Sequence, residues 1–149
     1  MTACHEEGGA AVAVAGIARV ALVGSPNAGK TSVFNHLTGL RAKTGNYPGV
    51  TVGRSVGITR VDGAPIAVED LPGTYSLDPI SPDEQVVADV LAGEVYDAGR
   101  PDAIVIVADA TTLHRSIMLV AQVLRQDLPC LLALSMTDEL IEILQVNCP

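Results

Sequence analysis

Two glycines, a lysine and a threonine stand in a spacing that can bind phosphate, in the segment Gly24-Ser-Pro-Asn-Ala-Gly-Lys-Thr31. The glycines let the backbone approach a phosphate closely, while successive N–H groups and the dipole of a following helix attract its oxygens. Lys30 adds a positive charge, and Thr31 offers a hydroxyl to Mg²⁺. The alternative is a glycine turn formed by chance, but an apolar strand pattern before the segment and a helical pattern after it favour a P-loop.

A carboxylate and a glycine follow about forty residues later, in Asp70-Leu-Pro-Gly73, directly after the apolar run Ile66–Val68. A carboxylate at a strand end can lie beside Mg²⁺, and the glycine N–H can reach a terminal phosphate. The alternative is a simple Pro-Gly turn. Thr51 lies between the two motifs, where a loop threonine can close over the phosphate and Mg²⁺; a threonine that merely starts a strand fits the spacing equally well.

The elements that must position these residues alternate between strands and helices. We expect strands at 17–23, 51–60, 65–69, 103–108 and 129–134, and helices at 32–40, 84–91 and 113–125. Asp62-Gly63 joins two strands as a hairpin, whereas Arg41–Val50 and Asp70–Asp83 have loop composition, the first predicting a mobile surface loop. One face of the last helix would carry Leu113, Ile117, Val120 and Leu124. The order predicts a three-layer α/β domain with a mainly parallel sheet and one antiparallel hairpin.

Length and composition exclude several classes of protein. The 149 residues suffice for one domain, and 48% hydrophobic residues indicate a folded chain. A net charge of -8 argues against nucleic acid as a partner. The apolar runs are shorter than the roughly 20 residues that cross a bilayer, and the N-terminus lacks the basic start of a signal peptide, so we expect a cytoplasmic protein. The three cysteines, Cys4, Cys130 and Cys148, predict free thiols, and Cys4-His5-Glu6-Glu7 predicts a flexible tail rather than a metal site.

Longer segments around these motifs resemble one known family. They are Gly24–Gly39, Gly45-Asn-Tyr-Pro-Gly-Val-Thr-Val52, the run from Asp70 to Glu84, Asp109-Ala-Thr111 and Ala133–Glu139. Together they resemble the GTP-binding domain of the ferrous iron transport protein B (FeoB) family, over about Ala18 to Leu140. The segments at 45–52 and 70–84 are more diagnostic than the P-loop itself.

The resemblance implies a P-loop G domain that hydrolyses GTP to GDP and phosphate, coupled to ferrous iron uptake, with Mg²⁺ and with K⁺ as an activating ion. Thr31, Thr51 and Asp70 would be the Mg²⁺ ligands, and Asn27 would help to hold K⁺. Lys30, Thr51, Gly73 and Asn27 would contribute to catalysis. Thr74 stands where many GTPases carry a water-positioning glutamine, and a monovalent cation can offset developing negative charge in its place.

The resemblance also implies a set of nucleotide contacts. They are Gly24, Ser25, Pro26, Asn27, Ala28, Gly29, Lys30, Thr31, Ser32, Gly49, Val50, Thr51, Asp70, Leu71, Pro72, Gly73, Ser135, Met136 and Asp138. The guanine-reading motif departs from the family, because Ser135-Met-Thr-Asp138 keeps the carboxylate but has serine in place of asparagine. We expect guanine preference with an affinity weakened by about 1–2 kcal/mol. A helix N-terminal role is the alternative for Asp138.

The predicted domain runs over residues 16–140, between a flexible tail at 1–15 and a C-terminal tail at 141–149. The family's last strand and helix are not expected here, so strand 129–134 would form an apolar edge and lower stability unless Leu140–Val146 covers it. The membrane channel of an iron transporter, or its accessory proteins, would be the partner. The alternatives are a degenerate nucleotide-binding module with little turnover, a ribosome-associated GTPase with RNA as partner, and an ATPase. We assign no role to His36 or His114. We expect Asp78, Asp83 and Glu84 to be solvated, with attraction of a cation as the alternative.

Overall fold

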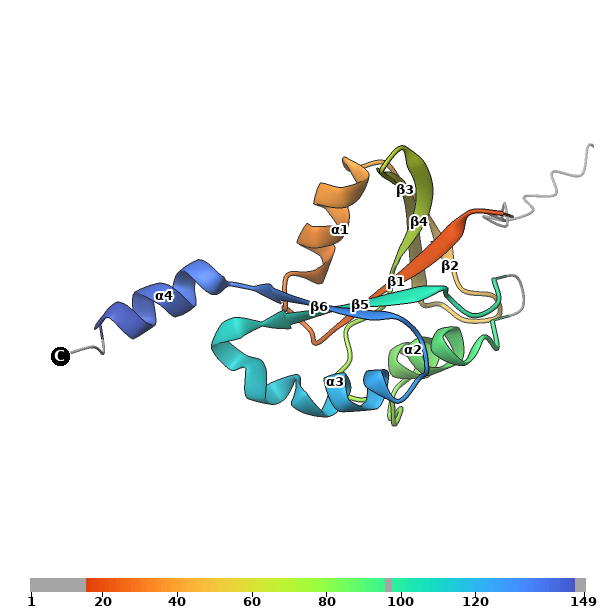
Figure 1. Ribbon diagram of the computed structural model, residues 1–149. Helices are drawn as coiled ribbons and strands as arrows, with labels where there is room; N and C mark the ends of the chain where they lie inside the picture. The colour runs from red at the N-terminus through yellow and green to blue at the C-terminus, as the bar shows by residue number, and fades with distance from the viewer. Residues whose placement is uncertain (1–15, 96–97, 147–149) are drawn as a thin grey trace, which may run out of the picture.

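The computed structural model describes residues 16–95 and 98–146 and contains one six-stranded sheet with helices on both faces (Figure 1). The strands are β1 Ala18–Gly24, β2 Ala42–Asn46, β3 Gly53–Val61, β4 Ala64–Asp70, β5 Ala103–Asp109 and β6 Cys130–Ser135. The helices are α1 Lys30–Thr38, α2 Pro82–Ala92, the 3₁₀ helix η1 Ala110–Arg115, α3 Ile117–Leu124 and α4 Thr137–Val146. The three-layer α/β prediction is confirmed.

The order of strands in the sheet is β2-β3-β4-β1-β5-β6. β1 pairs in parallel with β4 and β5, and β5 pairs in parallel with β6. The carboxyl ends of these four strands therefore meet at one edge of the sheet. β3 and β4 form the expected hairpin, whose turn residues Asp62 and Gly63 have φ values of 50° and 81°. Two positive φ values are what a two-residue hairpin turn requires.

Successive side chains of the central strand β1 point to opposite faces of the sheet and so contribute to both halves of the core. Leu22 packs with Phe34 and Val68 under α1. Val23 points to the opposite face, where it packs in a larger apolar cluster with residues of α2, α3 and β5. Period-two alternation thus places α1 on one face and α2 and α3 on the other, as Figure 1 shows.

One predicted loop is wrong. Ala42–Asn46, within the segment expected to be mobile, forms β2 and pairs antiparallel with β3. The next residue, Tyr47, is only 3% exposed. The Gly, Pro and Asn content of this segment gave no sign of a strand, because β2 is an edge strand stabilised by its backbone bonds to β3 and by the burial of Tyr47.

The predicted helix at 113–125 is interrupted, and the expected face is not its buried one. Ser116, only 1% exposed, separates η1 from α3. Leu119 and Val123 then contact the core, whereas Ile117 and Leu124 are 60% and 62% exposed. The capping of η1 by Asp109 starts a tighter 3₁₀ turn, which rotates the following residues relative to a continuous α-helix.

The predicted C-terminal tail at 141–149 is partly wrong, because α4 continues to Val146. Residues 147–149, which include Cys148, and the predicted tail at 1–15 lie outside the described residues. The apolar edge is observed: Leu131, Leu132 and Leu134 of β6 are 60%, 46% and 48% exposed, and α4 extends away from the sheet (Figure 1). Within the described ranges, no helix combines the length and apolar character needed to cross a membrane.

Candidate nucleotide-binding site

The predicted site residues gather at the carboxyl edge of the parallel strands. Gly24 ends β1, Asp70 ends β4 and Ser135 ends β6. The P-loop runs from Gly24 to α1, which begins at Lys30 with Gly29 as its N-cap residue. The N–H groups of the first turn of a helix have no partners within the helix, so this turn faces the site with donors and a positive dipole end.

The P-loop backbone has a shape that its sequence permits. Asn27 and Gly29 have φ values of 63° and 83°, in the left-handed region that asparagine and glycine tolerate best. A Cβ at Gly24 would lie 2.5 Å from the carbonyl oxygen of Val107. Glycine is therefore required for the packing of the loop against β5.

Three of the predicted residues touch one another. The Lys30 ammonium forms an ion pair with one carboxylate oxygen of Asp70. Thr31 Oγ1 donates to the other oxygen at 3.2 Å. Asp70 thus brings β4 to the start of α1, and a hydroxyl and a carboxylate, both hard oxygen ligands, lie side by side.

Two adjoining cavities open at this place. The larger one, of about 610 Å³, is lined by Ser25, Pro26, Asn27, Gly29, Lys30, Thr31, Ser32, Gly73, Asp83 and Met136. The second, of about 480 Å³, is lined by Lys30, Thr31, Thr51, Val52, Gly53, Ser55, Asp70, Leu71, Pro72, Gly73 and Asp83. Thr51 therefore faces the same cavity as Thr31 and Asp70. Six of the predicted nucleotide contacts line neither cavity: Gly24, Ala28, Gly49, Val50, Ser135 and Asp138.

Gly73 and Thr74 show how the segment after β4 is fixed. A Cβ on Gly73 would lie 3.0 Å from Pro26 Cα, so this glycine allows a close approach to the P-loop. Thr74 is fully buried; its N–H donates to the carbonyl of Gly24 at 3.0 Å, and its hydroxyl donates to the carbonyl of Ser76 at 2.6 Å. The Thr74 side chain is engaged inside the protein, so it is not free to orient a water molecule.

Two acidic residues that we expected to be solvated have other positions in the structure. Glu84 is not merely solvated: its carboxylate accepts from the N–H of Ile80 at 2.9 Å, and its own N–H donates to Ser81 Oγ at 3.3 Å. The Ser81-x-x-Glu84 spacing is that of a capping box, a signal present in the sequence. Asp83 lines both cavities and so adds a negative charge beside Lys30 and Thr31.

The serine of the predicted guanine-reading motif is bound to the P-loop. Ser135 Oγ donates to the carbonyl of Ala28 at 2.6 Å and lies 3.2 Å from that of Ala108. Met136 has a φ of 54° and lines the larger cavity. Asp138 is exposed in the first turn of α4. The structure thus connects Ser135 and Met136 to the site and places Asp138 at a helix N-terminus.

A P-loop between β1 and α1, an aspartate at the end of β4 and a threonine loop facing the same cavity define a P-loop domain of the G-domain class. The sequence profile described as ferrous iron transport protein B matches residues 18–145. The chain belongs to the ferrous iron transport protein B family.

Individual relatives agree with this assignment. A Porphyromonas gingivalis fusion of Fe(2+) transport protein A with the Fe(2+) transporter FeoB is 44% identical over 123 residues, 83% of this chain and 14% of that protein. The Salmonella typhimurium Fe(2+) transporter FeoB is 41% identical over 80% of this chain and 15% of its own length. The chain therefore spans about one seventh of these curated relatives.

Solved structures show the same fold. The G domain of the T. maritima FeoB iron transporter aligns with a TM-score of 0.77 and 37% identity, covering 88% of this chain and 82% of that one. An E67A mutant of S. thermophilus NFeoB bound to GDP aligns with a TM-score of 0.76 and 40% identity, covering 85% of this chain and 48% of that one.

Proposed function

We propose that this chain binds GTP with Mg²⁺ and hydrolyses it to GDP and phosphate. The observation that carries the proposal is the convergence of Lys30, Thr31 and Asp70, with Thr51 and Gly73 on the wall of the same cavity. GDP is bound in the S. thermophilus relative, which supports a guanine nucleotide as the ligand here.

The residues present fit a magnesium ion. Thr31, Thr51 and Asp70 supply two hydroxyls and a carboxylate facing one cavity, and hard oxygen ligands of this kind suit Mg²⁺. When bound, the ion would neutralise charge on the phosphate oxygens. Asn27 lines the larger cavity and carries an amide oxygen that suits K⁺, so it is the candidate ligand for an activating monovalent cation.

The protein's own groups act by position and charge. The Lys30 ammonium would bind phosphate oxygens, and the backbone N–H of Gly73 would donate to the terminal phosphate. The P-loop amides would hold the remaining oxygens. Because Thr74 is buried and engaged elsewhere, we expect hydrolysis to be slow unless a monovalent cation supplies additional charge stabilisation.

Guanine selectivity would depend on Ser135, Met136 and Asp138. One observation favours the second candidate function, a nucleotide-binding module with little turnover. The Ser135 hydroxyl donates to the P-loop carbonyl of Ala28, and Asp138 lies outside the lining of both cavities. Base recognition therefore requires Asp138 to approach the site from α4.

Coupling to ferrous iron uptake follows from family membership and rests on parts of the relatives beyond the matched region. The domain would work at the cytoplasmic face of a membrane, with the channel of an iron transporter or its accessory proteins as partner. The nucleotide state of the loops that carry Thr51 and Gly73 would be the signal that the partner reads.

The test is competition of GDP, GTP, ADP and ATP for a fluorescent guanine nucleotide, followed by phosphate release, each in K⁺ and in Na⁺ buffer. Lys30→Ala should abolish binding, whereas Lys43→Ala, at the other, exposed lysine, should not change it. Guanine-selective binding with faster phosphate release in K⁺ would support the proposal. Absence of guanine-selective binding in a folded sample, or binding with no phosphate release, would favour the module and contradict the proposed hydrolysis.

A further inference from the structure

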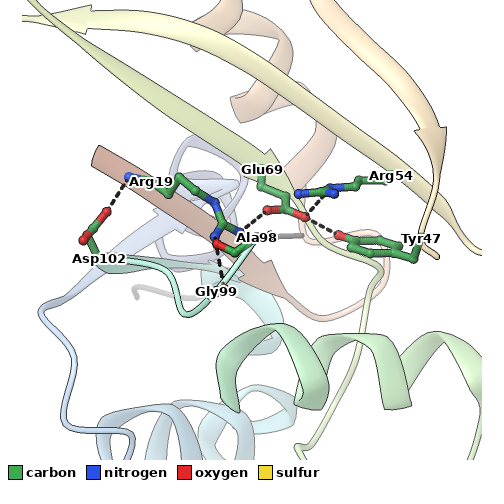
Figure 2. Close-up of polar contacts among 7 residues, drawn as sticks. All are labelled: Arg19, Tyr47, Arg54, Glu69, Ala98, Gly99 and Asp102. Carbon is green, nitrogen blue, oxygen red and sulfur yellow. Dashed lines mark hydrogen bonds and ion pairs between the residues drawn. The ribbon is translucent and has the colours of Figure 1, made fainter. Parts of the chain in front are cut away.

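A buried carboxylate, Glu69 of β4, is the centre of a polar cluster outside the nucleotide site (Figure 2). Its side chain is 3% exposed. One oxygen accepts from the Tyr47 hydroxyl at 2.7 Å and from Arg54 Nε at 3.1 Å, and the other accepts from Arg19 at 2.8 Å. Four segments of the sheet region thus meet at one carboxylate, which is stabilised in the interior by two guanidinium groups.

Tyr47 forms the base of the loop that carries Thr51. Its N–H donates to the carbonyl of Val52 at 3.0 Å, and its carbonyl accepts from the N–H of Val50 at 3.3 Å. Tyr47 and Val52 are 3% and 8% exposed, while Val50 is 41% exposed. The loop therefore has a buried base and an exposed tip, and Thr51 lies one residue from the base.

The same cluster is adjacent to Asp70 and Thr31, two of the proposed Mg²⁺ ligands. Glu69 directly precedes Asp70, and successive residues of a strand point to opposite faces. The Glu69 side chain accepts from Tyr47 on one face of the sheet, while Asp70 contacts Lys30 and Thr31 on the other. The hydrogen bond from Tyr47 to Glu69 therefore joins the base of the Thr51 loop to the strand that carries Asp70.

We propose that Tyr47 is a positioning residue for hydrolysis, whose hydroxyl fixes the loop so that Thr51 meets Thr31 and Asp70. The inference rests on the proposed function, because positioning of Thr51 matters where a terminal phosphate and Mg²⁺ are bound. Binding of GDP depends chiefly on the P-loop and should not require it.

The hydroxyl and the ring of Tyr47 make different contacts, so their contributions can be tested separately. Burial and the adjacent Glu69 raise the pKa of Tyr47, so the hydroxyl keeps its proton and remains a donor. The ring packs in the core cluster and lies 5.4 Å from the Arg54 guanidinium carbon. Tyr47→Phe keeps the ring and removes the donor, while Glu69 retains both arginines.

The experiment compares the full chain with Tyr47→Phe and with Tyr75→Phe, the same change at a tyrosine that is 44% exposed. We expect Tyr47→Phe to lower kcat about five- to tenfold, the size expected for loss of one hydrogen bond of typical net strength, and to leave the Kd for GDP within about twofold. Higher Mg²⁺ should be needed for half-maximal GTP turnover. Tyr75→Phe should change none of these values.

A second measurement is independent of turnover. Amide hydrogen exchange at Tyr47 and Val50 is followed with Mg²⁺ and a non-hydrolysable GTP analogue, using the amides of β1 and β5 to detect any global loss of stability. Protection at the two loop amides should fall about five- to tenfold in Tyr47→Phe relative to the wild-type chain, with β1 and β5 unchanged.

The outcomes are distinct. Unchanged protection at the loop amides in Tyr47→Phe would overturn the inference, as would an equal loss of GDP affinity or of protection in β1 and β5, because either would show a general structural role. If the wild-type chain releases no phosphate, the proposed hydrolysis fails, while the exchange measurement still decides whether Tyr47 positions the loop.

Discussion

Removal of the Ser135 hydroxyl tests the proposed guanine-reading motif and its connection to the P-loop. In Ser135→Ala the donor to the Ala28 carbonyl, 2.6 Å away, is lost, and so is the weaker contact to Ala108 at 3.2 Å. Ala28 belongs to the P-loop, so the change loosens the connection between β6 and the phosphate-binding backbone. We expect both lower stability and weaker nucleotide binding.

The magnitude follows from one hydrogen bond. A neutral hydrogen bond contributes about 0.5–1.5 kcal/mol net, and Ser135 is only partly buried, so water can partly replace the lost donor. A cost of about 1 kcal/mol predicts a fall in Tm of about 2–4 °C for a chain of this size. If the same energy is needed to order the P-loop around GDP, the Kd for GDP should rise about fivefold.

Ser135→Asn tests the base-recognition half of the argument. Asparagine supplies a donor for the P-loop and an amide for guanine, so we expect GDP to bind about five- to thirtyfold more tightly, which corresponds to about 1–2 kcal/mol. The assays are titration with a fluorescent guanine nucleotide and thermal unfolding. Thr44→Ala, at an exposed hydroxyl on β2, is the control. An unchanged Tm and Kd in Ser135→Ala would refute the P-loop connection. Weaker GDP binding by Ser135→Asn would refute the idea that serine in place of the family's asparagine weakens guanine binding.

Two further changes test the scaffold of the site. Gly24→Ala would place a Cβ 2.5 Å from the Val107 carbonyl, so we expect a destabilisation of about 1–3 kcal/mol in urea unfolding, whereas Gly45→Ala, with no atom within 4 Å, should have little effect. Asp109→Ala removes the cap whose carboxylate accepts from the Thr111 N–H at 2.8 Å, at a cost of about 1 kcal/mol near pH 7.

The effect of Asp109→Ala on stability should depend on pH with a defined sign. Bonds from Thr111 lower the pKa of Asp109 in the folded protein, so its contribution is present above the unfolded-state pKa and is lost as pH falls through the folded-state value. The stability difference between wild type and Asp109→Ala should therefore shrink on acidification below the ordinary aspartate range. A difference that grows on acidification would contradict the capping role, and equal effects of the two glycine changes would contradict the packing argument.

Features encoded within a few neighbouring residues could be predicted from the sequence. The P-loop, the Asp62-Gly63 hairpin and the strand that ends at Asp70 depend on local spacing, and each is found where it was expected. The fold class followed because strand and helix patterns alternate along the chain. Thr51 illustrates the limit: spacing left its role open, and only the structure brings it to the cavity that Asp70 also lines.

Features that depend on distant partners could not be predicted. β2 exists because β3 pairs with it, and Tyr47 is buried because Glu69, more than twenty residues away, accepts its hydroxyl bond. The break at Ser116 changes which face of α3 is buried, although the apolar residues suggested a continuous helix. In each case the deciding contact lies outside the window in which periodicity is visible.

The ion pair between Lys30 and Asp70 leads to a prediction whose sign depends on Mg²⁺. A phosphate that binds Lys30 would compete with the Asp70 carboxylate, whereas Mg²⁺ in the proposed site would take that carboxylate as a ligand. Asp70→Asn should therefore strengthen GDP binding in EDTA, because Lys30 loses a competing anion, and weaken it in Mg²⁺. Since Asp70 is only partly buried, we expect a change of about two- to fivefold in each direction. Titrations of the fluorescent guanine nucleotide in the two buffers measure both effects, with Asp62→Asn, in the distant hairpin turn, as the control. Weaker binding of Asp70→Asn in both buffers would show that Asp70 orders the site rather than competing for Lys30.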